Sequence, residues 1–229
     1  MASKTYPGRC LISKNDTTKR KAKTEILRAL KEERAEEKTP QSWLVLFNGS
    51  GMPEFWIYLL VDKKATLEDV DRKLRDVWLE CCGHLSSFTI AGREYESNPE
   101  GSYHEDAKGM DIRVDKIFCE NLTGEHIYDY GSSTYLDFKV ISKLPYSTKK
   151  GYDVEIVARN KMPEAVCSVC GKEATIICLE CMYDGSDEYL FCDECYEDHE
   201  CDEGMQLPVV NSPRCGVCGY EGGLDDDMC

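Results

Sequence analysis

The sequence has no long apolar segment. Its longest apolar runs, at 43–47 and 55–61, have the length of strands, whereas a membrane-spanning helix needs roughly 20 residues. No secretory signal peptide is recognisable near the first residues either. We therefore expect a cytoplasmic protein, and its 229 residues are enough for a substantial core.

Positive charge is nearly absent from the last third of the chain. Residues 163–229 contain seventeen Asp and Glu residues, with Lys172 and Arg214 as the only Lys and Arg. The formal charge of this segment, −15, equals that of the whole chain, so residues 1–162 are neutral overall. Because nucleic-acid binding depends on cations that contact phosphates, this acidic segment is expected to contact protein rather than nucleic acid.

The same acidic segment is rich in cysteine. Four Cys-x-x-Cys pairs begin at Cys167, Cys178, Cys192 and Cys215, and His199 follows the third pair. Two thiolates from one tight turn can occupy two vertices of a zinc tetrahedron, and a second pair completes it. In a reducing compartment such spacing favours metal ligation over disulfides. We expect two zinc ions, although four thiolates also bind iron.

The spacing is similar to that of cross-braced zinc fingers of the B-box and MYND kinds. This resemblance implies that the first and third ligand pairs share one ion, and the second and fourth share the other. The first site would then consist of Cys167, Cys170, Cys192 and Cys195. The second would contain Cys178, Cys181, His199 and either Cys201 or Cys218. Only one residue separates Cys201 from His199, which makes their joint chelation awkward.

A zinc-ribbon pairing is the alternative. It would join Cys167 and Cys170 to Cys215 and Cys218, leaving the two middle pairs for the other ion. The cross-brace is favoured because it explains the short spacings and His199. Either pairing leaves no coordination position open for water, which predicts structural rather than catalytic metal. A dithiol redox role needs a thiolate of low pKa, and the acidic surroundings would raise the thiol pKa instead.

The remaining cysteines are expected to be packed or free thiols. They are Cys10, Cys81, Cys82, Cys119 and Cys229. Because Cys81 and Cys82 are adjacent, they are not expected to chelate one ion together.

The first 40 residues predict a basic arm. Residues 1–16 have no pattern, whereas residues 17–38 predict a helix with an apolar stripe of Ala22, Ile26, Leu27 and Leu30. Basic residues begin this helix and acidic residues end it, which opposes the helix dipole. The arm could anchor nucleic acid through Lys14, Lys19, Arg20, Lys21, Lys23 and Arg28. Alternatively, it is a solvated helix that packs on the next domain.

Residues 41–160 predict an α+β domain with a mixed, mainly antiparallel sheet. The expected strands are 43–47, 55–61, 87–92, 125–130, 134–144 and 153–157. One main helix begins at the cap residue Thr66 and ends near Gly83. A small zinc-binding domain at 163–229 completes the predicted organisation.

The middle of the chain resembles the plasmid pRiA ORF-3-like family over residues 42–157. The resemblance is carried by Phe55-Trp-Ile-Tyr-Leu-Leu-Val, Ala65-Thr-Leu-Glu-Asp-Val, Cys82-Gly-His-Leu and Ile127-Tyr-Asp-Tyr-Gly. It implies a compact α+β domain found in bacteria and archaea, partly on mobile elements, with no established activity. Of the polar residues typical of the family, this chain has His84 and Asp129, whereas Ser86, Thr134 and Leu136 replace the others.

Three functional hypotheses follow. The favoured one is a non-enzymatic adaptor whose acidic zinc domain contacts a protein partner. The second is a nucleic-acid or ribonucleoprotein factor anchored by the basic arm. The third is an enzyme that uses a cleft near His84 and Asp129.

Overall fold

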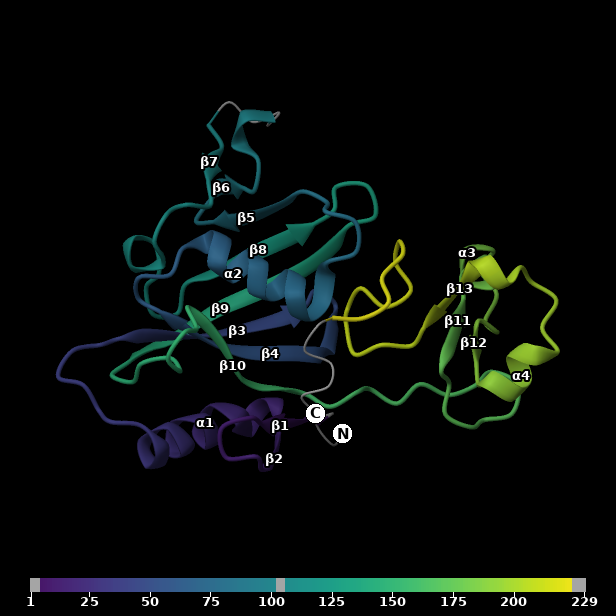
Figure 1. Ribbon diagram of the computed structural model, residues 1–229, viewed down its shortest axis with the longest axis horizontal. Helices are drawn as coiled ribbons and strands as arrows, with labels where there is room; N and C mark the ends of the chain where they lie inside the picture. The colour runs from purple at the N-terminus through teal and green to yellow at the C-terminus, as the bar shows by residue number, and fades with distance from the viewer. Residues whose placement is uncertain (1–4, 102–105, 224–229) are drawn as a thin grey trace. The chain divides into compact units, whose positions relative to one another are not determined.

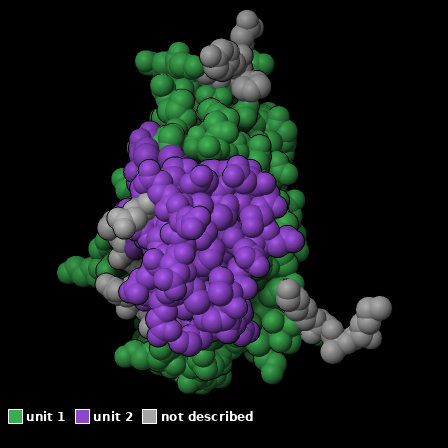
Figure 2. Space-filling model, turned by 90° about the vertical axis from the view of Figure 1, so that its right-hand side faces the viewer, with its two compact units in different colours: residues 1–75, 84–161, 229 green, residues 76–83, 162–228 purple. Residues whose placement is uncertain are grey.

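The computed structural model describes residues 5–101 and 106–223, which form two compact units (Figure 1). Unit 1 contains the described residues up to Arg75 together with His84–Lys161. Unit 2 contains Asp76–Gly83 and the described residues from Met162 onward (Figure 2). The short segment 76–83, which the sequence placed in the α+β domain, thus belongs to the same unit as the cysteine-rich region.

Unit 1 is built on a ten-stranded sheet with the order β2-β1-β10-β4-β3-β9-β8-β5-β6-β7. Every neighbouring pair is antiparallel except β6 and β7. This large, mainly antiparallel sheet with few helices confirms the predicted fold class in outline. The strands are β1 Pro7–Cys10, β2 Asp16–Thr18, β3 Ser42–Gly49, β4 Met52–Asp62, β5 Ser86–Ile90, β6 Arg93–Glu96, β7 Lys108–Gly109, β8 Thr123–Tyr128, β9 Thr134–Leu144 and β10 Val154–Asn160.

Helix α1 (Lys19–Glu33) covers one face of this sheet (Figure 1). Its residues Ala22, Ile26 and Leu30 are buried in a cluster that also contains Trp56 and Val157. The apolar stripe predicted from the sequence therefore packs on the sheet. The helix is shorter than predicted at both ends, and its early end is consistent with acidic residues that oppose the dipole at a C-terminus.

Helix α2 (Leu67–Leu74) lies on the opposite face. The predicted cap is present, because Thr66 and Asp69 exchange side-chain and backbone hydrogen bonds in a capping box. The helix continues as a π-helical turn, η1 (Arg75–Leu79). The two principal helices of unit 1, α1 and α2, thus lie where helices were predicted. Short 3₁₀ turns complete the unit: η2 Pro99–Gly101 and η3 Val114–Lys116.

A buried polar group joins α2 to the sheet. Nε2 of His126 on β8 lies 2.7 Å from Oδ1 of Asp71, and Arg75 donates from Nε to Oδ2 of the same carboxylate at 2.7 Å. Burial raises the pKa of Asp71, but the hydrogen bonds with His126 and Arg75 outweigh it and lower the pKa overall. The carboxylate therefore stays charged and paired inside the unit.

Strands β1, β2, β6 and β7 were not predicted from the sequence. Strand β1 contains Pro7 and Gly8, which are unfavourable in strands. Gly8 is required here, because a Cβ atom would collide with the ring of Trp56 and the carbonyl of Arg159. Tertiary packing therefore determines this strand. The predicted arm at 1–40 contributes β1, β2 and α1 to unit 1.

Unit 2 has little regular structure and a small apolar cluster. Its three-stranded antiparallel sheet has the order β12-β11-β13. Only Ile177, Leu179 and Leu207 are buried in the apolar cluster there. The elements are β11 Ile176–Cys178, α3 Leu179–Tyr183, β12 Leu190–Phe191, α4 Asp193–Glu197, η4 Glu203–Met205 and β13 Gln206–Pro208.

None of the helices formed by the described residues combines the length and apolar character needed to cross a bilayer. A cytoplasmic location stays a prediction.

Leu30→Ala should destabilise unit 1, because it leaves a cavity between α1 and the sheet. Such truncations cost about 2–5 kcal/mol, measurable as the free energy of unfolding in denaturant. Lys23→Ala on the exposed side of α1 is the matched control and should change stability by no more than about 0.5 kcal/mol. Equal effects of the two substitutions would show that α1 does not pack on the sheet.

Candidate metal centres

Three groups of side chains bring potential metal ligands together. Cluster 1 consists of Cys167, Cys170, Cys192 and Cys195. Cluster 2 consists of Cys178, Cys181, His199 and Cys201. Cluster 3 contains the thiols of Cys81, Cys82 and Cys218, all in unit 2. The ligand atoms of clusters 1 and 2, and the three sulfurs of cluster 3, lie within 4.8 Å of one another in each cluster.

Cluster 1 joins a tight turn to the start of α4. The amide of Gly171 donates to the carbonyl of Cys167 at 3.0 Å, and Gly171 has a φ of +76° that favours glycine. This turn brings the side chains of Cys167 and Cys170 together in cluster 1. Cys192 occupies the N-cap position of α4, and its sulfur lies 3.6 Å from that of Cys170.

Cluster 2 joins α3 to the chain that follows α4. Cys178 is the N-cap residue of α3, and Cys181 lies within this helix. The sulfur of Cys181 lies 3.4 Å from Nε2 of His199 and 3.7 Å from the sulfur of Cys201. The ring of His199 is held beside that of Phe191, with centroids 4.3 Å apart.

These distances test whether the clusters fit a metal ion. A disulfide requires sulfurs about 2.05 Å apart, whereas zinc with bonds of about 2.3 Å to each thiolate separates them by about 3.8 Å in a tetrahedron. The sulfur–sulfur distances of 3.6 and 3.7 Å in clusters 1 and 2 match the tetrahedron. The residues therefore fit a four-coordinate ion in each cluster.

The thiol pKa values show why a cation suits these clusters. Hydrogen bonding with Cys170, followed by burial, raises the pKa of Cys195 to about 12. Burial, followed by hydrogen bonding with Cys181, raises the pKa of Cys201 to about 12. In contrast, the backbone amide of Cys170 helps to lower the pKa of Cys167 to about 6. Crowded thiols resist joint deprotonation without a cation, and a divalent ion removes that obstacle.

The grouping is the one that the cross-braced arrangement predicts. The ribbon pairing is not formed, because Cys167 and Cys170 lie with the third pair and not with Cys215 and Cys218. Cys215 instead accepts a hydrogen bond from the amide of Val210 at 3.2 Å and contacts the apolar cluster of unit 2.

The two candidates for the eighth ligand lie in different clusters. Cys201 lies with His199 and Cys181 in cluster 2, whereas Cys218 lies in cluster 3. Cys81 and Cys82 are free cysteines, as expected, and Cys218 lies beside them. The signal that sequence reasoning missed is the Cys81-Cys82-Gly-His84 run, which is dense in ligand residues. Of the other cysteines, Cys10 is buried, Cys119 is exposed and Cys229 lies outside the described residues.

The two polar residues that the family resemblance singles out converge within unit 1. Nε2 of His84 lies 3.6 Å from Oδ2 of Asp129. The ring of His84 also packs edge-on against Tyr128. The hypothesis of a catalytic cleft at this pair stays a prediction.

Cys201→Ser should release one metal ion per chain, because it removes a ligand of cluster 2. Cys215→Ser is the matched control and should leave the metal content unchanged. Elemental analysis of the two purified variants distinguishes the pairings. In the ribbon pairing, Cys215→Ser would release an ion and Cys201→Ser would not.

Metal affinity should rise with pH between about 6 and 8. The raised pKa values of Cys195 and Cys201 mean that both thiols hold protons at neutral pH in the metal-free clusters. A metal ion must displace these protons, so affinity increases about tenfold per pH unit for each proton released. Zinc titration of metal-free protein against a competing chelator measures this slope. An affinity independent of pH would contradict thiolate ligation.

The comparisons with known proteins do not identify a family for this chain. A scan against models of protein families finds no match, and a search of curated proteins finds none either. Among solved structures, the chain is similar to the crystal structure of a protein of unknown function, MM3350 from Methanosarcina mazei Go1. The likeness has 15% identity and a TM-score of 0.42, and it covers 53% of this chain and 68% of that one. The ORF-3-like resemblance therefore stays a prediction.

Proposed function

We propose that this chain is a non-enzymatic zinc-binding interaction protein whose acidic, metal-folded unit contacts a basic surface on a protein partner. The observation that carries this proposal is the pair of closed four-ligand clusters in unit 2. Each cluster supplies a full tetrahedral set from the protein, which is typical of structural zinc, whereas catalytic zinc keeps a position for water.

The donor set favours zinc as the ion. Cluster 1 offers four thiolates and cluster 2 offers three thiolates with one imidazole. Zinc binds both sets in a tetrahedral geometry without a redox reaction. The apolar cluster around Ile177, Leu179 and Leu207 is small, and structural zinc supplies about 10–16 kcal/mol of apparent binding energy in small fingers.

The surface of unit 2 favours a basic protein partner. Ten exposed carboxylates lie around clusters 1 and 2: Glu180, Asp184, Asp187, Glu188, Asp193, Glu194, Glu197, Asp198, Glu200 and Asp202. Zinc with four thiolates adds a further −2, because the ligands carry twice the charge of the ion. Lys172, one of the two cations in this segment, is paired with Glu194. Such a surface attracts cations and repels phosphate.

Exposed apolar side chains lie among these charges. Tyr183, at the end of α3, is 63% exposed, and Val169, between Cys167 and Cys170, is 61% exposed. Aromatic residues are frequent anchors at protein interfaces, where charged residues form the rim. The acidic surface therefore offers contact points for a protein as well as charge.

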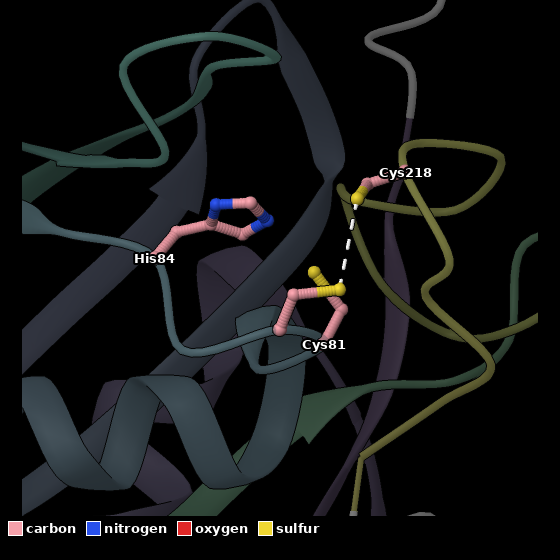
Figure 3. Close-up of side chains that lie close together, drawn as sticks. Cys81, His84 and Cys218 are labelled. Carbon is pink, nitrogen blue, oxygen red and sulfur yellow. Dashed lines mark hydrogen bonds between the residues drawn. The ribbon is translucent and has the colours of Figure 1, made fainter.

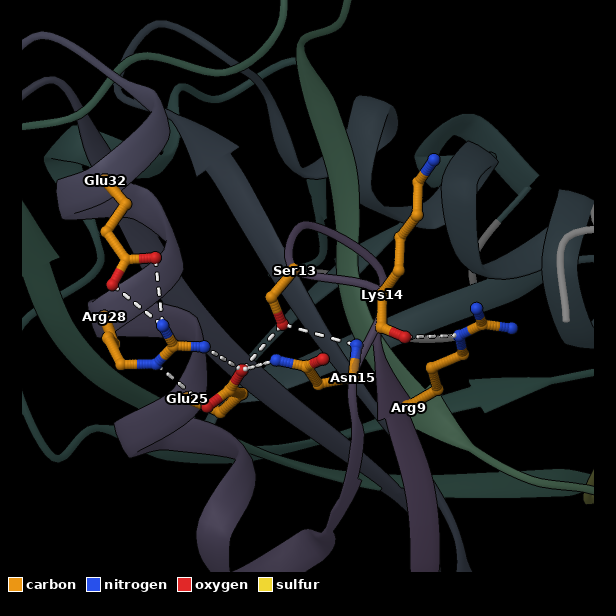
Figure 4. A network of polar contacts seen from close by, with 7 residues as sticks. All are labelled: Arg9, Ser13, Lys14, Asn15, Glu25, Arg28 and Glu32. Atoms are coloured by element: carbon orange, nitrogen blue, oxygen red, sulfur yellow. Dashed lines mark hydrogen bonds and ion pairs between the residues drawn. The ribbon is translucent and has the colours of Figure 1, made fainter.

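The alternative of nucleic-acid binding through the basic arm is weaker. Arg28 pairs with Glu25 at 2.7 Å and with Glu32 at 2.8 Å (Figure 4). Lys19 donates to the carbonyl of Pro53 at 3.2 Å and is half-buried. Two of the six candidate cations, Lys19 and Arg28, therefore already interact with groups of unit 1. The carboxylates of Glu25 and Glu32 lie beside Arg28.

The proposal is tested by charge reversal in the full chain. Asp184→Lys, Asp187→Lys and Glu188→Lys together change a loop of unit 2 that contains no cluster residue. Glu33→Lys, Glu36→Lys and Glu37→Lys form the matched control, because these three acids are exposed in unit 1. Proteins captured by the tagged chain from its native extract are then purified and titrated with each variant.

The expected result is a partner whose affinity falls at least about tenfold with the unit 2 reversal and with zinc removal, but not with the control. A chain purified without chelator that contains no zinc would contradict the metal part of the proposal. A partner whose affinity falls equally with both charge reversals would contradict the interaction part. Retention on heparin that is abolished by substituting the basic residues of the predicted arm would contradict it as well.

A further inference from the structure

We propose that cluster 3 is a third zinc site, formed by the thiolates of Cys81, Cys82 and Cys218, which all belong to unit 2. The site would join the segment 76–83 to the last described residues of unit 2. It adds a metal centre to the two cross-braced clusters and does not depend on them.

The segment 76–83 is fixed by buried hydrogen bonds within unit 2. The hydroxyl of Ser212 donates to the carbonyl of Trp78 at 2.6 Å, and that of Tyr220 donates to the carbonyl of Val77 at 3.3 Å. Gly223 passes so close to the Val77 carbonyl that a Cβ atom would collide with it. These contacts hold Cys218 next to the adjacent cysteines independently of any metal.

The geometry of the sulfurs fits zinc. The sulfurs of Cys82 and Cys218 lie 3.9 Å apart, close to the edge of about 3.8 Å in a zinc–thiolate tetrahedron. This distance is far longer than a disulfide, and it resembles the 3.6 and 3.7 Å of clusters 1 and 2. Figure 3 shows the side chains of Cys81 and Cys218 close together within unit 2. The three thiols are therefore arranged like those of the two clusters with complete ligand sets.

Arg214 places a positive charge beside the thiols. Its side chain is fully buried and donates from Nη2 to the sulfur of Cys81 at 3.4 Å. Three thiolates around a divalent ion would carry a net charge of −1, and a neighbouring guanidinium would stabilise that charge.

The three thiolates would occupy three vertices of a zinc tetrahedron. The fourth vertex would then be available to a water molecule or another small ligand.

Alkylation of the native chain tests the site without any substitution. Cys82 and Cys119 are both exposed, so burial alone predicts that both react with iodoacetamide. If zinc is bound to cluster 3, Cys119 is labelled rapidly, whereas Cys82 is labelled only after a chelator is added. Peptide mass spectrometry reads both positions in one sample. Equal labelling of the two cysteines in the zinc-loaded chain, or a disulfide at Cys82, would overturn the proposal.

Metal content provides the second measurement. The reduced full chain should contain about three zinc ions, and Cys218→Ser should contain about two while exposing Cys82 to alkylation. Cys215→Ser, three residues away, is the control and should retain three. A wild-type content of two with a reactive Cys82 would overturn only the third site. A content of zero would instead contradict the proposed zinc function as a whole.

Discussion

The stability of unit 2 depends on the balance between crowded thiols and a cation. Eight ligands are gathered into two groups, each within 4.8 Å, beside an apolar cluster with three buried members. Without a metal, the pKa values of Cys195 and Cys201 are raised to about 12, with thiol crowding and burial among the causes. When zinc is bound, the same crowded thiols would serve as its ligands. Metal–sulfur bonds at the two clusters would therefore supply energy that a hydrophobic core normally supplies.

Unit 1 is stabilised in a different way. Its sheet buries apolar side chains on both faces, with α1 on one face and α2 on the other. The charges buried there are paired, as Asp71 is with His126 and Arg75. This unit needs no metal to account for its packing. Removal of zinc should consequently affect the two units unequally, because the two clusters with complete ligand sets both lie in unit 2.

Local sequence pattern predicted the features that local chemistry determines. Strand β9 was predicted with its observed bounds, and the cap at Thr66 is present, because alternation and capping depend on neighbouring residues. The short spacings also indicated which cysteines group in clusters 1 and 2. Strand β1 was missed because its partner β10 lies about 150 residues later. The proximity of Cys218 to Cys82 was not predicted for the same reason, since 136 positions separate the two residues and no spacing rule applies.

The charge of unit 2 links its folding to its proposed interaction. Zinc binding fixes thiolates that would otherwise hold protons, so the metal-loaded unit carries more negative charge near its exposed carboxylates than the metal-free thiols would. The chain segments that carry Asp193, Glu194, Asp198 and Glu200 also contain cluster ligands, so coordination positions these carboxylates. A basic partner would recognise a surface whose shape and charge both depend on the ion. Metal binding and partner binding should therefore be thermodynamically coupled, each favouring the other.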